Sequence, residues 1–551
     1  MWPRRFTPCF ANCSPSAPID WARFFWQGIA RNERKKAMAF LYEGAAWDAD
    51  LLRRVYDAIE PIARDELGLD VYPNQRQVVS SEQMLDAYAS VGMPSMYKHW
   101  SFGKKFARED ALYRRGMREL AYELVINSNP CISFYLEDST ATMQTLTTAH
   151  AAFGHNHFFK NNYLFKEWTD AGSVLDYLQF AQGYVAKCED RYGIEAVEHI
   201  LDAAHALMPQ GVFRAKRSPP LSYSKQIERA KARRHYEAER FNELWYRTVP
   251  QSPVGDDEEE YTSLSDGKRP MPLRLPEENI LYFLEKNSPS LDGWQRELLR
   301  IVRSIAQYFH PQRQTKVMNE GCATFVHHYI MNRLWEKGLL PESAMLEFAD
   351  MHSMVITQPE FDDPRFTGFN PYKLGFEMMC DIRRMCENPT EEDLHYVPSL
   401  VGKTDWRAAL REAWAEHRDE SFILQYLSPK LMRDMRLFSL SRVEGERHVT
   451  VEHIHDPHGY RHVRRTLAGM YDAGRSDPDI QVVGADLRGD RTLKLRYHVV
   501  DGSRLADDDA KKVMQYLTRL WRYPILLEYA HEDGKVRDGF SATPDSGVKR
   551  I

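Results

Sequence analysis

The sequence predicts a mainly α-helical body followed by a small C-terminal α+β domain with ferredoxin-like βαββαβ order. Three observations support this prediction. From about residue 45 to 440, apolar residues recur every three or four positions, which is the helix period. Beyond about residue 447, the pattern becomes strand-like alternation separated by two amphipathic stretches. The 551 residues, 43% of them hydrophobic, also suffice for more than one packed core.

The first segment, residues 1–37, differs in composition from the rest of the chain. It is rich in Pro, Ser and Cys and has no periodic apolar face. It also lacks the apolar run and cleavage site of a secretory signal peptide. Because Met38 opens a helical pattern, we expect residues 1–37 to be a disordered tail or a wrongly assigned gene start.

The helical body is predicted to span residues 38–440. Helix-period runs include LLRRVYDAIEPIARDEL, SVLDYLQFAQGYVAKCEDRYG and WQRELLRIVRSIAQYF. One stretch interrupts them, residues 249–276, where Pro, Gly, Asp and Glu accumulate. We expect this stretch to be a flexible acidic loop whose charges face solvent.

The C-terminal domain is predicted to span residues 447–540. HVTVEHIH alternates like a strand, and GYRHVRRTLAGMYDAG follows with the period of a helix. IQVVGADLRGDRTLKLRYHVVD resembles two strands, LADDDAKKVMQYLTRLW a helix, and YPILLEYAHEDG a last strand. Residues 541–551 are then a tail. His458 and His462 have the four-residue zinc spacing, but without an evident third ligand we interpret them as a surface pair.

Composition excludes several classes of protein. The formal net charge of −6 argues against nucleic-acid binding driven by a strongly basic surface. Seven cysteines without a CxxC pair indicate reduced thiols and therefore a cytoplasmic protein. No apolar run approaches the roughly 20 residues that span a bilayer.

The segment AHAAFGHNHFFKNN, residues 149–162, contains three histidines and raises the question of a metal site. His150 and His155 are five residues apart, so one straight α-helix does not direct both imidazoles at one ion. A bend at Gly154 would bring them together. The alternative is that these histidines are hydrogen-bonded in a polar core or on the surface.

A metal site needs a carboxylate from another segment, and KVMNEGCATFVHHYIMNRLW supplies Glu320. Its Asn-Glu-Gly order is similar to the glutamate-bearing helix of some zinc peptidases, which makes a zincin-like helical core possible, although HExxH is missing. A glutamate in a first helical turn is also favoured by the helix dipole alone. The predicted ligands are His150, His155 and Glu320, with His157, His327 or His328 as alternates, and they suit zinc, manganese or iron(II).

Two further groups are candidates for chemistry beside such an ion. Glu137 or Asp138, in FYLEDST, would act as a general base or would orient a histidine. Lys160, Asn161 and Asn162 would bind a substrate carboxylate or oxyanion. A polar loop that ends a helix explains these last three residues equally well.

Long stretches of the chain resemble the stage V sporulation protein R (SpoVR) family. The matching runs include LDVYPNQRQVVSSEQMLDAYASVGMP, HWSFGKKF, QTKVMNEGCATFVHH, NPYKLGFEMMCDIRR and DESFILQYLSPKLMRDMRLF. Cys322 stands where the family commonly has Trp. The resemblance implies a link to the peptidoglycan cortex in spore formers and to stress or stationary phase elsewhere. It also implies neighbourhood with a PrkA-type serine protein kinase and a von Willebrand factor A-like protein.

Two classes of function follow from these observations. The first is a metal-dependent hydrolase acting on an amide or peptide bond, such as one in a peptidoglycan precursor. The second is a non-enzymatic scaffold that docks the kinase or its target, with no metal and no catalytic residues. Metal content separates the two.

Overall fold

A computed structural model gives the structure of the chain. It describes residues 39–90, 93, 96–115, 122–214, 262–263, 271–273, 275–359, 363–366, 368–400, 402–437, 439–441, 450–453, 456–500, 502–531 and 533–551. The predicted N-terminal extension, residues 1–37, lies outside these ranges. Most of the predicted acidic loop, residues 249–276, lies outside them as well. Within that loop, the described strands β4 (Thr262–Ser263) and β5 (Met271–Pro272) pair antiparallel.

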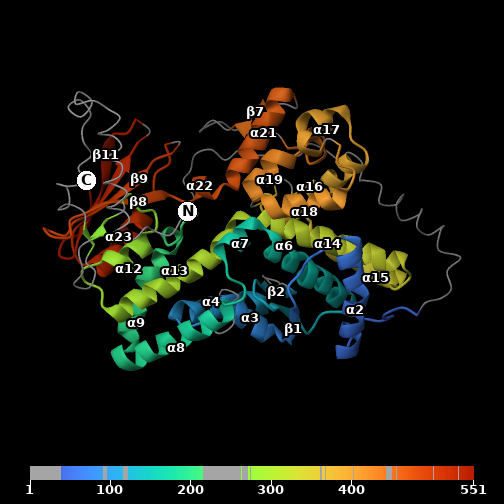
Figure 1. The fold of residues 1–551 in the computed structure, drawn as a ribbon, viewed down its shortest axis with the longest axis horizontal. Helices are drawn as coiled ribbons and strands as arrows, with labels where there is room; N and C mark the ends of the chain where they lie inside the picture. The colour runs from blue at the N-terminus through green and yellow to red at the C-terminus, as the bar shows by residue number, and fades with distance from the viewer. Residues whose placement is uncertain are drawn as a thin grey trace, which may run out of the picture. The chain divides into compact units, whose positions relative to one another are not determined.

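The described residues form two compact units, each built from two stretches of chain. The helical unit takes its residues from ranges 4–183 and 310–476, and the sheet unit takes them from ranges 184–309 and 477–551. Figure 1 shows the predominance of helices in the chain. The predicted mainly helical body is therefore confirmed.

The helical unit has a core in which long helices pack around two short π-helices. The π-helices are η1 (Ile62–Glu66) and η2 (Thr148–His155). The α-helices are α2 (Ala49–Pro61), α3 (Ser81–Ala89), α4 (Trp100–Arg114), α5 (Ala141–Thr147), α6 (Asn156–Asn161), α7 (Tyr163–Trp168), α14 (Lys316–Glu336), α15 (Glu342–Val355), α16 (Pro371–Glu387), α17 (Glu391–Tyr396), α18 (Trp406–Glu416), α19 (Asp419–Tyr426), α20 (Pro429–Asp434), α21 (Pro457–Met470) and α22 (Ala473–Ser476). Of the three boundaries between the units in the described chain, two fall within α8 (Val174–Tyr192) and α13 (Gly293–Gln314), and the third follows α22.

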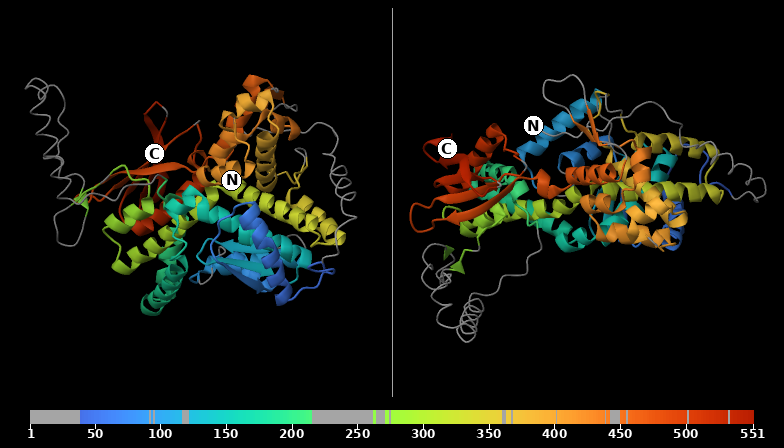
Figure 2. Two further views of the ribbon diagram at one scale, coloured as in Figure 1. Left: turned by 45° about the vertical axis from the view of Figure 1, so that its right-hand side comes forward. Right: turned by 90° about the horizontal axis from the view of Figure 1, so that it is seen from above.

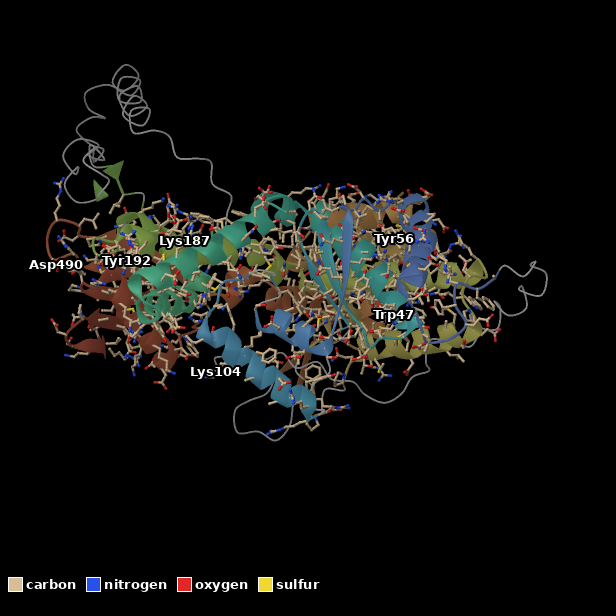
Figure 3. The ribbon with its side chains drawn as sticks, turned by 90° about the horizontal axis from the view of Figure 1, so that it is seen from below. Trp47, Tyr56, Lys104, Lys187, Tyr192 and Asp490 are labelled. Atoms are coloured by element: carbon tan, nitrogen blue, oxygen red, sulfur yellow. The ribbon has the colours of Figure 1, made fainter. Side chains whose placement is uncertain are left out.

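Helix α2 packs directly on the π-helix that carries two of the histidines. The ring of Tyr56, on α2, lies 5.2 Å from the ring of Phe153 on η2. The Trp47 indole, just before α2, donates a hydrogen bond to the Ser139 carbonyl at 2.6 Å. Figure 3 shows Tyr56 and Trp47 at this end of the unit. The first contact holds α2 against η2. The second holds the residues before α2 against the turn that precedes α5.

The helical unit also contains a small sheet that the sequence analysis did not predict. Its strands are β1 (Asn74–Val79), β2 (Glu123–Ile126) and β3 (Cys131–Leu136), in the order β1-β3-β2. β1 pairs parallel with β3, and β2 pairs antiparallel with it. Figure 2 shows this sheet among the helices from the N-terminal half of the chain. Because β3 is buried along most of its length, its sequence CISFYL lacks alternation and gives little strand signal.

The sheet unit holds a five-stranded mixed sheet in the order β12-β11-β10-β9-β8. Its strands are β8 (Asp479–Ala485), β9 (Leu493–His498), β10 (Ile525–Ala530), β11 (Val536–Thr543) and β12 (Gly547–Arg550). β9 and β10 are parallel and are joined by α23 (Asp507–Trp521), while the other neighbouring pairs are antiparallel. The helices α9 (Ile194–Ala206) and α12 (Ile280–Asn287) belong to the same unit.

This sheet differs from the predicted βαββαβ arrangement of residues 447–540. The alternating residues 450–453 do form a strand, β7, but it pairs with β6 (Ser439–Ser441), and the following helix α21 contacts α19. Residues 541–551, predicted as a tail, instead supply the end of β11 and all of β12. Periodicity identifies a strand or a helix without saying which neighbour it packs against, so the first two elements were assigned to the wrong unit.

Among the described helices, none combines the length and the apolar character that crossing a bilayer requires.

Candidate metal centre

His150 and His155 converge because the segment between them is a π-helix. η2 continues α5 without a break and runs directly into α6. In a π-helix the backbone hydrogen bonds join residues five apart, so side chains five apart lie on one face of the helix. The two imidazole rings accordingly lie 4.7 Å apart, nearly perpendicular to each other. The predicted bend at Gly154 is not what joins them, because helical geometry continues through that position.

Gly154 has a different role, which is the close approach of two backbones. A Cβ atom at this position would lie 2.5 Å from Cα of Ala323 on α14. α14 approaches α16 in the same way, since a Cβ atom on Gly321 would lie 2.6 Å from the backbone of Gly375. The three helices therefore pack at distances that only glycine permits. This packing brings Glu320, next to Gly321, beside the histidines.

A carboxylate that comes near both histidines is that of Glu123, which was not among the predicted ligands. One ligand atom each from Glu123, His150 and His155 lies within 4.8 Å of the other two. His150 Nε2 lies 3.2 Å from Glu123 Oε1. Glu123 stands at the start of β2, and β2 is held beside η2 by the small sheet. In the sequence, Glu123 can be recognised only as an acidic residue at the start of a short apolar strand.

Glu320 lies next to His155. Its Oε2 atom is 3.5 Å from His155 Nε2, and this buried oxygen has no hydrogen bond among the described residues. Of the predicted ligands, the structure thus brings His150 and His155 together and places Glu320 beside His155. Tyr372, on α16, contributes a hydroxyl beside Glu320 and stacks its ring on His150 at 6.5 Å.

The remaining ring nitrogens of both histidines are occupied by polar side chains. His155 Nδ1 lies 2.9 Å from Asn319 Oδ1, an acceptor, so Nδ1 carries the proton and Nε2 offers its lone pair. His150 Nδ1 lies 2.8 Å from His327 Nδ1, and His327 Nε2 lies 2.9 Å from His352 Nδ1. His327, an alternate ligand in the sequence analysis, therefore orients His150, and His352 extends the chain. Such partners fix the tautomer of metal-binding histidines.

Burial keeps the imidazoles of His150 and His327 neutral. Burial and the neighbouring His155 lower the pKa of His150 well below its usual range. Burial and the neighbouring His150 do the same to the pKa of His327. The pKa of the neighbouring carboxyl group shifts upward instead. Burial and the charge of Glu320 raise the pKa of Glu123 to about 8. Two carboxylates in one partly buried site therefore repel each other, and a cation between them relieves that repulsion.

The other residues of the histidine segment point toward a different part of the unit. His157 Nδ1 accepts a hydrogen bond from the Asp70 backbone amide at 3.0 Å. Lys160 pairs with the Asp70 carboxylate at 2.5 Å, and Asn161 donates to the Asp70 carbonyl at 2.8 Å. Asn162 donates to two carbonyls near the end of α18 and caps α7. These four side chains contact backbone segments, so the structure does not bring them into the cluster.

The structure does not bring the predicted general bases into the cluster. Glu137 and Asp138 are exposed in the turn between β3 and α5. Asp138 accepts a hydrogen bond from Ser81 at 3.4 Å. His328, the other alternate ligand, lies among Phe348, Phe376 and His352. Glu137 and Asp138 lie in the segment FYLEDST, and His328 directly follows His327. The structure brings none of these three side chains into the cluster.

Comparison with known proteins covers most of the chain. A family model described as SpoVR like protein matches residues 46–476, and one described as SpoVR-like C-terminal domain matches residues 478–532. In Escherichia coli (strain K12), the protein named "Uncharacterized protein YcgB" is 48% identical over 496 residues, which cover 90% of this chain and 95% of that protein. No solved structure matches the chain.

Proposed function

The chain belongs to the SpoVR family, and we propose that it is a divalent-metal-dependent hydrolase that cleaves an amide or peptide bond. One observation carries the proposal: ligand atoms of Glu123, His150 and His155 lie within 4.8 Å of one another. Two imidazoles and one carboxylate are a donor set typical of catalytic zinc and non-haem iron(II) sites, and manganese is the third candidate. The zincin-like core stays part of this proposal, since a two-histidine helix packs on a helix that carries a glutamate.

The residues present fit such an ion. Ligands around zinc bind at about 2.0–2.2 Å, so donors within a few ångströms of one another need only small side-chain movements to share an ion. Both histidine Nε2 atoms face carboxylates, while both Nδ1 atoms are held by other side chains. The Oε2 atom of Glu320, which is buried and has no hydrogen bond among the described residues, is the sort of polar group that a ligand satisfies.

Each side chain then has a distinct role. Glu123, His150 and His155 would hold the ion, which supplies Lewis acidity that polarises a carbonyl and makes water a better nucleophile. Glu320 is 18% exposed and lies beside this set, so we assign to it the proton that water releases. Burial and Glu320 raise the pKa of Tyr372, so its hydroxyl stays protonated and able to donate to a developing oxyanion. Addition of water across the C–N bond yields a carboxylate and an amine.

The substrate proposed is an amide in a peptidoglycan precursor, because the family is linked to cortex formation in spore formers. The proposed location is the cytoplasm. A PrkA-type serine kinase and a von Willebrand factor A-like protein are the proposed partners, and no nucleic acid is expected to bind. The site supports the chemistry, whereas these assignments rest on the family resemblance alone.

The experiment separates metal binding from turnover. Metal-loaded protein is incubated with purified soluble peptidoglycan precursors, and new amines and carboxylates are detected by mass spectrometry. Glu123→Ala is expected to lose both metal and turnover, and Glu320→Gln to keep metal but lose at least about 100-fold in turnover, the usual range for general-base removal. Glu137→Gln changes an exposed carboxylate nearby and serves as the matched control with parent activity.

A parent protein that holds no metal after purification and reconstitution would contradict the hydrolase. The non-enzymatic scaffold would then replace it. Equal turnover by the parent and Glu320→Gln would contradict the proton-transfer role while leaving the metal centre intact.

A further inference from the structure

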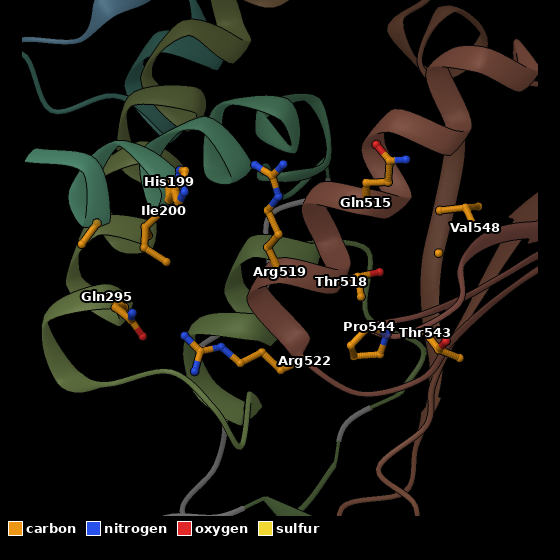
Figure 4. A pocket seen from close by; sticks show the side chains of 12 residues that line it. His199, Ile200, Gln295, Gln515, Thr518, Arg519, Arg522, Thr543, Pro544 and Val548 are labelled. Atoms are coloured by element: carbon orange, nitrogen blue, oxygen red, sulfur yellow. The ribbon is translucent and has the colours of Figure 1, made fainter.

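A second site lies in the sheet unit and involves none of the residues of the metal centre. A pocket of about 640 Å³ is lined by α9, by Gln295 on α13, by α23 and by the turn between β11 and β12. Figure 4 shows the guanidinium groups of Arg519 and Arg522 directed into the space between α23 and the helix that bears His199 and Ile200. Its volume falls in the range of about 300–1,000 Å³ that small-molecule sites occupy.

The two guanidinium groups have no counter-ion. Arg519 and Arg522 are exposed and form no ion pair with any residue that the structure describes. The one contact seen for Arg519 is with the ring of Tyr516, 4.9 Å away. His199, also exposed, adds an imidazole on the opposite wall. The pocket therefore gathers positive charge and hydrogen-bond donors, and no carboxylate lines it.

The backbone of Arg522 is unusual for an arginine. It caps α23 in the left-handed region, with φ of 62°, a position where glycine is favoured and where other residues cost about 1–2 kcal/mol. Arg491 has a similar φ of 60°, but its side chain is used by the fold, since it donates a hydrogen bond to Tyr523. Arg522 has no such intramolecular partner among the described residues. A side chain kept at this backbone position without a contact in the fold points to a contact outside it.

The simplest alternative is that cations in the last turn of α23 offset the helix dipole. That effect explains a basic residue near the end of any helix. It explains neither the pocket in front of the two guanidinium groups nor the choice of arginine over glycine at the left-handed cap.

We propose that this pocket binds a small phosphate-bearing ligand. The phosphate lies between Arg519 and Arg522, because two guanidinium forks match a tetrahedral dianion better than a single carboxylate. The body of the ligand packs on the apolar wall made by Ile200, Pro544 and Val548. A pocket of this size accommodates a molecule on the scale of a nucleoside monophosphate. The site is independent of the metal centre and of the hydrolase.

The test uses the full chain after treatment with EDTA, so that phosphate binding to a metal does not contribute. Inorganic phosphate is titrated by calorimetry at constant ionic strength, and saturable binding is expected. Arg522→Gly removes the guanidinium while easing the backbone conformation, so the melting temperature is retained and phosphate affinity falls about tenfold or more, the value of one charge-assisted hydrogen bond. Arg519→Ala is expected to weaken binding similarly.

Arg491→Gly is the matched control, because it removes an arginine from the same backbone conformation outside the pocket. Absence of saturable phosphate binding to the parent would overturn the proposal, and so would an equal loss in Arg491→Gly. A parallel titration with AMP tests the apolar wall. Because AMP would bury some apolar surface against this wall, we expect it to bind about tenfold more tightly than inorganic phosphate. AMP binding no tighter than phosphate would overturn the assignment of this wall to the ligand.

Discussion

At the scale of single residues, Gly154 determines how close the histidine helix comes to α14. In Gly154→Ala the new methyl group would meet Cα of Ala323 at 2.5 Å, so η2 and α14 must separate. We expect a loss of about 1–3 kcal/mol in the free energy of unfolding, as overpacking usually costs, and weaker metal binding. Chemical denaturation and metal titration measure the two effects.

The control for this substitution is Gly183→Ala. Gly183 is also in a helix, α8, but a Cβ atom there would meet nothing within 4 Å. Alanine at such a position is expected to stabilise by about 0.5–1 kcal/mol. If Gly154→Ala behaved like Gly183→Ala, the close approach of η2 and α14 would not matter for the site.

Asn319 contributes to the site without being a ligand. Its Oδ1 atom accepts a hydrogen bond from His155 Nδ1 at 2.9 Å and so directs Nε2 toward the carboxylates. Asn319→Leu is expected to weaken metal affinity about 10–100-fold, the typical effect of losing such a partner. Asn332→Leu, on the same helix and contacting His328, should retain parent affinity. Unchanged affinity in Asn319→Leu would mean that this hydrogen bond does not fix the tautomer of His155.

At the scale of elements, the joint between α16 and α17 depends on a buried ion pair. Arg384 donates two hydrogen bonds to the Asp393 carboxylate, at 2.7 and 2.8 Å, and the Thr390 hydroxyl and amide donate to it as well. Burial alone would raise the pKa of Asp393, but these hydrogen bonds outweigh it and hold the pKa at about 2. Because the folded pKa is below the unfolded one, the stabilisation is present above about pH 4 and is lost as pH falls toward 2.

This lowered pKa leads to a measurable pH dependence. Asp393→Asn should be less stable than the parent by about 2 kcal/mol or more at pH 7, and the difference should shrink as pH falls from about 4 to 2. Urea denaturation of both proteins at several pH values measures the difference directly. A difference that stays constant down to pH 2 would contradict the assigned pKa.

The π-helix shows what the sequence could predict about the site and what it could not. The histidine segment, Glu320 and the need for a second helix were all visible in the residues. The five-residue spacing of His150 and His155 counts against an α-helical metal site, and only the π-helical turn makes it favourable. That turn packs against α14, and tertiary contacts of this kind leave no periodic signal. Glu123, His352 and Tyr372 were missed because they come from other elements, whereas Asn319 stands in the Asn-Glu-Gly motif beside Glu320 but was given no role.

At the scale of the whole molecule, residues 447–540 do not form the independent domain that alternation suggested. The sheet unit needs chain segments from before residue 310, since the Ser288 hydroxyl donates to the Leu520 carbonyl at 3.0 Å and Phe283 packs on Trp521. A fragment of residues 447–540 lacks these contacts and the strand β12, and it carries α21 from the helical unit. We therefore expect it to show no cooperative thermal unfolding by circular dichroism. A sharp, reversible transition would restore the sequence-based domain.

The helical content of the body and the strands and helix of residues 479–530 followed from periodicity. The grouping of elements into units did not, because both units are assembled from distant stretches of chain. The β11–β12 hairpin escaped prediction because its residues are largely polar or charged.

The central claim is that Glu123, His150 and His155 hold a divalent metal ion, and metal content tests it most directly. The full chain, purified without chelators, is analysed by inductively coupled plasma mass spectrometry beside His155→Ala, Glu123→Ala and the control Glu137→Gln. The claim predicts close to one equivalent of zinc, manganese or iron in the parent and in Glu137→Gln, and little in the other two variants. A parent without metal, or His155→Ala and Glu123→Ala with as much metal as the parent, would contradict it.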